Sequence, residues 1–127
     1  MKVISIKQPW ASLIVNGYKV YEFRTWKTKY RGKLLIHASK IPDKKAVERF
    51  KYLNLEFPTG AIIGEVELID CIEMNETFAK ELFNKDPNVY RNVLKHEGYA
   101  WKLDNIHKLD KYISASGRLG LWEYSEK

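Results

Sequence analysis

Three blocks near the start of the chain decide the fold: SIKQPWA at residues 5–11, GYKVYEFR at residues 17–24 and YRGKLLIHAS at residues 30–39. The first block runs from a strand-like stretch into a helix, because Pro9 is tolerated at the first helical position and Gly17 supplies a stop. The apolar patterns of the second and third blocks are typical of strands. The fold therefore opens in the order strand, helix, strand, strand.

The rest of the chain mixes short helices with strands in no regular β-α-β order. This arrangement predicts an α+β fold with a mostly antiparallel sheet, and closure of that sheet into a small barrel would remove exposed edges. The patterns predict a helix after an N-cap at Asp43, a long strand over 60–72, short helices over 77–83 and 87–94, and strands over 99–103 and 119–124.

The composition fits one domain that spans residues 1–127. The chain weighs 15.0 kDa and is 45% hydrophobic, which is enough for one core. It carries 22 Lys and Arg against 16 Asp and Glu, for a formal net charge of +6 and a pI near 9.3. A basic surface attracts phosphate, so this balance favours an anionic partner such as RNA.

Cysteine and histidine positions give no sign of a metal or a cofactor. Cys71 has no partner for an intrachain disulfide, and its apolar strand-like setting predicts a buried, unreactive thiol. His37, His96 and His107 lack metal-ligand spacing, and His37 fits a hydrogen-bonded core histidine. No apolar run reaches the ~20 residues of a membrane span, and Lys7 interrupts any secretory core. We therefore expect a cytoplasmic monomer without a metal, a cofactor or a membrane partner.

The three opening blocks together resemble the ASCH domain. They match its QPWA start, its G-x-K-x-x-E-x-R signature and its RG-x-L-x-I-H-A strand. Weaker matches follow in the same order at 60–64, 99–101 and 117–122, so the resemblance covers nearly the whole chain. It implies a PUA-like, mostly antiparallel β-barrel with short peripheral helices, in a small free-standing member of the family. It also implies a role in RNA metabolism or coactivation, or hydrolysis in some small bacterial members.

The signature supplies the candidate site. Gly17 can turn the chain so that Lys19 enters a cleft, where its ammonium binds phosphate or acts as a base; the alternative is a solvated lysine at a turn. Glu22 and Arg24 lie two residues apart on one strand face. The carboxylate can accept from a base amino group and the guanidinium can clamp phosphate, or the two form a structural ion pair.

A branch of the ASCH family removes the acetyl group of N4-acetylcytidine with a lysine, a threonine and a glutamate. Here Glu22 stands in the place of that threonine, so an amidohydrolase of acylated nucleosides would use water as nucleophile, with Lys19 and Glu22 as catalytic residues. The family's catalytic glutamate falls in the helical stretch after the long strand, where Glu81 and Glu97 are candidates.

The loop at residues 24–31, with the sequence RTWKTKYR, interleaves basic and aromatic residues. Such a loop can combine phosphate contacts with base stacking, as single-stranded RNA recognition requires; the alternative is a polar connection with Trp26 folded back on the barrel. Trp10, Trp101 and Trp122 are expected in the core. The predicted ligand-binding residues are Lys19, Glu22, Arg24, Trp26, Lys27, Lys29 and Arg31.

The preferred interpretation is a domain that binds RNA or a modified nucleotide, with the signature lining a basic cleft. An amidohydrolase acting on an acylated nucleoside such as N4-acetylcytidine is the alternative. A partner-recruiting domain in transcription, in which the surface of the barrel matters more than its cleft, is a third interpretation.

Overall fold

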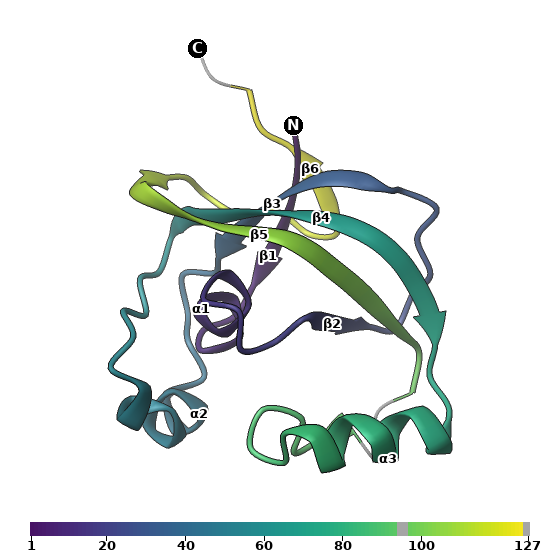
Figure 1. The fold of residues 1–127 in the computed structure, drawn as a ribbon. Coiled ribbons are helices and arrows are strands. Elements are labelled where there is room, and N and C mark those ends of the chain that lie inside the picture. The colour runs from purple at the N-terminus through teal and green to yellow at the C-terminus, as the bar shows by residue number, and fades with distance from the viewer. Residues whose placement is uncertain (94–96, 126–127) are drawn as a thin grey trace.

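The computed structural model describes residues 1–93 and 97–125 of the chain (Figure 1). Its elements follow the order predicted from the opening blocks. They are β1 (Lys2–Ile6), α1 (Trp10–Val15), β2 (Tyr21–Arg24), β3 (Gly32–Ala38), α2 (Lys44–Arg49), a 3-10 turn η1 (Lys51–Leu53), β4 (Ala61–Glu73), α3 (Glu76–Lys85), β5 (Tyr99–Ser114) and β6 (Leu121–Glu123).

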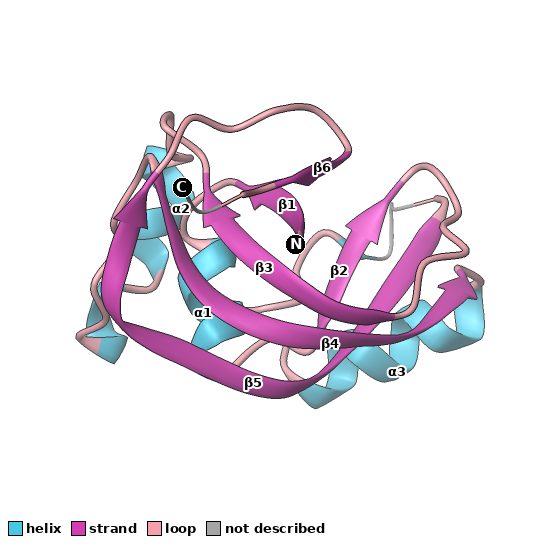
Figure 2. Cartoon of the chain, turned by 90° about the horizontal axis from the view of Figure 1, so that it is seen from above, coloured by secondary structure: helices cyan, strands magenta, loops and turns pink. Residues whose placement is uncertain are grey.

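The six strands form one curved sheet in the order β2-β5-β4-β3-β1-β6. The β1–β3 pair is parallel and the other neighbouring pairs are antiparallel, which confirms the predicted α+β fold with a mostly antiparallel sheet. Among the described residues no pairing joins β2 to β6, so the sheet is a half-barrel. Its strands arch over α1, and the helices lie on one side of the sheet (Figures 1 and 2).

Helix α1 is the centre of the core. Its residues 11–15 are buried, because the helix packs between the concave face of the sheet and the two outer helices. Ile14 joins the cluster under the sheet, which contains Ile4 and Trp101, whereas Leu13 joins a second cluster with Phe50 beside α3. Side chains of a strand alternate between its faces. Leu35 and Trp122 therefore pack on the opposite face of the sheet, in a third cluster.

Three expectations from the sequence are wrong in detail. β5 continues to Ser114, far past the predicted end at residue 103, because mostly exposed residues there still pair with β4 through the backbone. Instead of a helix over 87–94, residues 87–92 form turns, and Leu94 lies outside the described residues. Cys71 is half-buried rather than buried, since the end of β4 extends past the core. No described helix is long and apolar enough to cross a membrane.

Candidate functional site

The turn that follows α1 places the Lys19 side chain in the interior of the protein. Gly17 adopts a φ of 84°, which strains any residue with a side chain, and the amides of Tyr18 and Lys19 both donate to the Leu13 carbonyl at 2.9 and 3.1 Å. The chain therefore turns sharply and directs the Lys19 side chain inward, where the residue is only 3% exposed. The alternative of a solvated lysine at a turn is wrong.

The Lys19 ammonium contacts residues that follow it closely in the sequence. Nζ donates to Oε1 of Glu22 at 3.0 Å and to the carbonyl of Tyr21, and it lies 4.9 Å from the centre of the Phe23 ring. An ammonium has three donors, so two are used in hydrogen bonds and the charge is further stabilised by the ring. Burial lowers the pKa of Lys19 from its ordinary value of 10.5.

Glu22 lies between two cations. Its Oε1 accepts from Lys19, and its Oε2 accepts from Nε and Nη2 of Arg24 at 3.1 and 3.0 Å. Burial favours the neutral acid, yet the charges of Lys19 and Arg24 outweigh it and hold the pKa of Glu22 below its ordinary value of 4.5. Glu22 is thus an ionised carboxylate inside the protein, and the structural ion pair considered from the sequence is present.

Arg24 also joins two distant parts of the sheet. Its Nη2 donates to the Ser5 carbonyl at 2.8 Å, and Ser5 belongs to β1. Three strands separate β1 from β2 in the sheet order, so this bond crosses the open side of the half-barrel. The three signature residues therefore meet in one network that spans Lys19, Glu22, Arg24 and β1.

A cavity of about 250 Å³ opens beside Lys19 and Glu22. Its walls include the rings of Trp10, Phe23 and Tyr90, and its other lining residues are Val89, Asn92 and Val93. Trp10, expected in the core, is half-buried and lines this cavity, although it also packs edge-on against Phe50. The residues from 89 to 93 were not predicted at the site, and no local pattern in the sequence marks them.

A second cavity, of about 430 Å³, lies on the other side of Arg24 and includes Ser5 and His37 in its lining. His37 is buried and hydrogen-bonded, as expected. Its Nε2 lies 2.7 Å from the Ala115 carbonyl, which can only accept, so Nε2 carries the proton and Nδ1 accepts from the Ser5 hydroxyl at 3.0 Å. The same hydroxyl accepts from the Trp122 indole at 3.1 Å. Both ring nitrogens of His37 therefore have hydrogen-bond partners within the protein.

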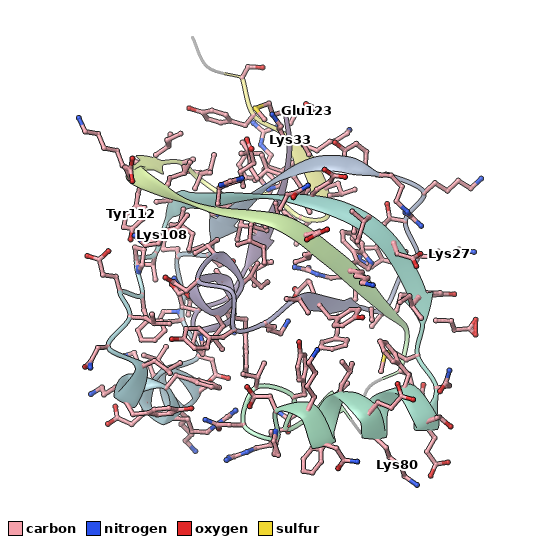
Figure 3. All side chains as sticks on the ribbon, in the orientation of Figure 1. Lys27, Lys33, Lys80, Lys108, Tyr112 and Glu123 are labelled. Carbon is pink, nitrogen blue, oxygen red and sulfur yellow. The ribbon has the colours of Figure 1, made fainter. Side chains whose placement is uncertain are left out.

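The basic and aromatic loop lies outside these cavities. Trp26 packs edge-on against Trp101, with ring centres 4.7 Å apart, so it is folded back on the sheet. Arg31 donates to backbone carbonyls of its own loop at 3.0 and 2.8 Å. Lys27 and Lys29 are exposed, and Lys27 projects outward (Figure 3). The structure does not bring these four side chains to Lys19, and their ligand-binding role stays a prediction.

The two candidate glutamates are also remote from Lys19. Glu81 is exposed on α3, and Glu97 lines a third cavity of about 800 Å³ together with Glu73 and Glu76. Neither lines the cavity beside Lys19. Among the described residues no three His, Cys, Asp or Glu side chains gather as a metal site would require, and His96 lies outside those residues.

The ASCH domain model matches residues 4–114 of the chain. The chain belongs to the ASCH domain family. It is 33% identical over 132 residues to activating signal cointegrator 1 of Homo sapiens and of Mus musculus, an alignment that covers 83% of this chain. The chain spans only 23% of the length of these curated relatives.

Solved ASCH structures share the fold. The crystal structures of ASCH from Zymomonas mobilis and of a mutant of it each match with a TM-score of 0.58 at 18% identity. Each covers 89% of this chain, and the chain covers 72% and 74% of them, respectively. The predicted PUA-like fold of the ASCH family is therefore confirmed.

Proposed function

We propose that this ASCH domain binds RNA or a modified nucleotide and that one base enters the cavity beside Lys19. The observation that carries the proposal is a buried, ionised carboxylate that lines a cavity with aromatic walls. Glu22 can accept from an exocyclic amino group, and Trp10, Phe23 and Tyr90 offer rings for stacking. The cavity volume of about 250 Å³ lies below the ~300–1,000 Å³ of pockets for drug-sized ligands. A single base matches that size better than a peptide does.

The ion pairs with Lys19 and Arg24 orient the Glu22 carboxylate and keep it ionised. Lys19 and Arg24 fix both of its oxygens, so the carboxylate loses no rotational freedom when a ligand binds. They also keep it ionised at neutral pH, because its pKa is lowered. A base that presents an amino group, such as cytosine or adenine, should therefore bind better than uracil.

Replacing Trp10 by leucine is expected to weaken nucleoside binding. Stacking of a base on an aromatic ring contributes ~1–3 kcal/mol, so the dissociation constant should rise by roughly 5- to 150-fold. Titration of nucleosides into the protein, followed by calorimetry or NMR, measures the change. Tyr52→Leu is the matched control, because this aromatic residue is 66% exposed and lines none of the three cavities described above. Equal losses in both variants would contradict the proposed base pocket.

A second candidate function is hydrolysis of a small acylated nucleoside. The observation in its favour is the buried Lys19 amine, whose pKa is lowered beside the cavity. The two cations make Glu22 a weaker base, so Lys19 in its neutral form would take a proton from water. The water oxygen would add to the acetyl carbonyl of N4-acetylcytidine, and the proton would pass to the departing N4. Cleavage of the carbon–nitrogen bond then yields acetate and cytidine.

Lys19→Ala is expected to abolish acetate release, because Lys19 supplies the only amine among the described residues that line that cavity. Chromatography of N4-acetylcytidine incubated with the protein measures turnover. Lys102→Ala removes an exposed lysine of β5 and serves as the control with full activity. Failure of the wild-type protein to release acetate would reject the hydrolase and leave the binding function in place.

A further inference from the structure

The second cavity, beside Arg24 and Ser5, is lined by several positively charged side chains. Its lining includes Lys7, Arg24, Lys40 and Arg118, and none of the described residues that line it carries a carboxylate. Among the described residues, Lys7, Lys40 and Arg118 form no ion pair, whereas Lys2, Lys51 and Lys80 each have a carboxylate within 3.1 Å. Like charges brought together without a counter-ion repel one another, and an anion in the hollow would relieve that repulsion.

The same cavity has exposed apolar edges. Leu119 is 98% exposed and Ile41 is 70% exposed, and these are the largest exposed fractions among the large hydrophobic side chains that the structure describes. Both residues line the cavity. Exposed aliphatic side chains beside cations suit a ligand with a flat apolar part and an anionic part. A nucleotide has both.

Arg24 connects this cavity to the base pocket. Its guanidinium lines the second cavity while Nε and Nη2 bind Glu22, which lines the first. A ligand whose base contacts Glu22 would therefore have its backbone close to Arg24. Guanidinium forks bind phosphate through paired hydrogen bonds, and lysines contribute as point charges.

We propose that the second cavity is a subsite for the phosphate and the neighbouring nucleotide of a bound strand. The inference rests on the proposed function, because the first base occupies the pocket beside Lys19. Lys7, Lys40 and Arg118 contact the phosphate, and Leu119 and Ile41 pack against the neighbouring base. The ligand is then a single-stranded oligonucleotide of at least two residues rather than a free nucleoside.

The subsite is tested with two variants of equal charge. One variant carries Lys7→Ala, Lys40→Ala and Arg118→Ala in the cavity. The matched control carries Lys45→Ala, Lys102→Ala and Lys111→Ala, which are exposed lysines outside the cavities described above. A third variant, Lys27→Ala with Lys29→Ala and Arg31→Ala, tests the loop. Binding of cytidine, cytidine monophosphate, a dinucleotide and a short single-stranded RNA is measured between roughly 50 and 200 mM salt.

The cavity variant should bind RNA roughly 10- to 100-fold more weakly and reduce the slope of log affinity against log salt by about 0.7, the contribution of the one phosphate contact in the subsite. Cytidine binding should be unchanged in this variant, and the control should retain the wild-type slope. Leu119→Ser with Ile41→Ser should weaken the dinucleotide and leave the monophosphate unaffected. Inorganic phosphate should compete only weakly, because it lacks the base.

The outcomes separate the subsite from the base pocket. If cytidine binds and the cavity variant keeps the RNA affinity and slope of the wild type, the subsite is overturned and the proposed function survives. A loss confined to the loop variant would likewise place the phosphate contacts on residues 27–31. If neither cytidine nor RNA binds the wild type, the proposed function fails, and the subsite with it. If an acidic peptide binds through the cavity and RNA does not, the hollow serves a protein partner.

Discussion

Replacing Glu22 by alanine is expected to lower the free energy of unfolding by roughly 3–5 kcal/mol, the range for removal of one partner of a buried ion pair. The side chains of Lys19 and Glu22 are 4% and 11% exposed, so solvent compensates only in part for the lost carboxylate. The variant would leave two cations facing each other, and Arg24 would lose the group that holds it against Ser5 across the open side of the half-barrel. Denaturation by urea, fitted for midpoint and slope, measures the loss.

Two further variants make this result specific. Glu81→Ala removes an exposed carboxylate from α3 and should change stability by no more than about 0.5 kcal/mol. The double variant Lys19→Met/Glu22→Leu removes both buried charges and should be more stable than Glu22→Ala alone, because apolar side chains of similar volume can replace a buried ion pair. A loss below about 1 kcal/mol in Glu22→Ala would show that water reaches the pair after all.

Local chemistry explains what could be predicted. The turn at Gly17 and the two-residue spacing of Glu22 and Arg24 depend on neighbours in the sequence, and both occur as expected. Asp43 accepts from the Ala46 amide at 3.1 Å, as an N-cap should. These features need no knowledge of distant segments, which is why the signature residues could be placed together before the fold was known.

Distant segments explain what could not be predicted. Tyr90 lines the cavity beside Lys19 and accepts from the Val20 amide at 3.2 Å, a contact between residues 70 positions apart. Arg118 and Leu119 reach the second cavity from the last connection of the chain. Neither position shows a periodic pattern or a motif of its own, since their placement depends on how the half-barrel curves. The sequence therefore predicted that Lys19, Glu22 and Arg24 lie together, but not which distant residues line the cavities around them.

The loop after β2 makes contacts that its composition does not predict. Its alternation of basic and aromatic residues is typical of RNA-binding loops, yet Trp26 packs against Trp101 and Arg31 bonds to the backbone of its own loop. Those two side chains already have contacts within the protein. Among the described residues, Lys7, Lys40 and Arg118 line the second cavity without a carboxylate partner, and they are far apart in the sequence.

Acid is expected to destabilise this ASCH domain through Glu22. The pKa of Glu22 is lower in the folded chain than its ordinary value of 4.5 in the unfolded chain, so the unfolded chain binds more protons between these two values. Stability from the ion-pair network is therefore fully present above pH 4.5 and is lost as the pH falls through the folded pKa. Urea denaturation of the wild type at a series of acidic pH values measures this slope.

Variants of Glu22 and Lys19 test whether Glu22 causes the loss of stability at acidic pH. Glu22→Gln cannot titrate, so its stability should depend less on pH below 4.5 than that of the wild type, although its stability at neutral pH is lower. Lys19→Met leaves Arg24 as the remaining cation beside Glu22, which reduces the depression of the pKa and shifts the loss of stability to higher pH. Glu81→Gln is the exposed control and should follow the wild type. An acid slope that is the same in Glu22→Gln and the wild type would assign the effect to other carboxylates, because a glutamine at this position carries no proton equilibrium in that range.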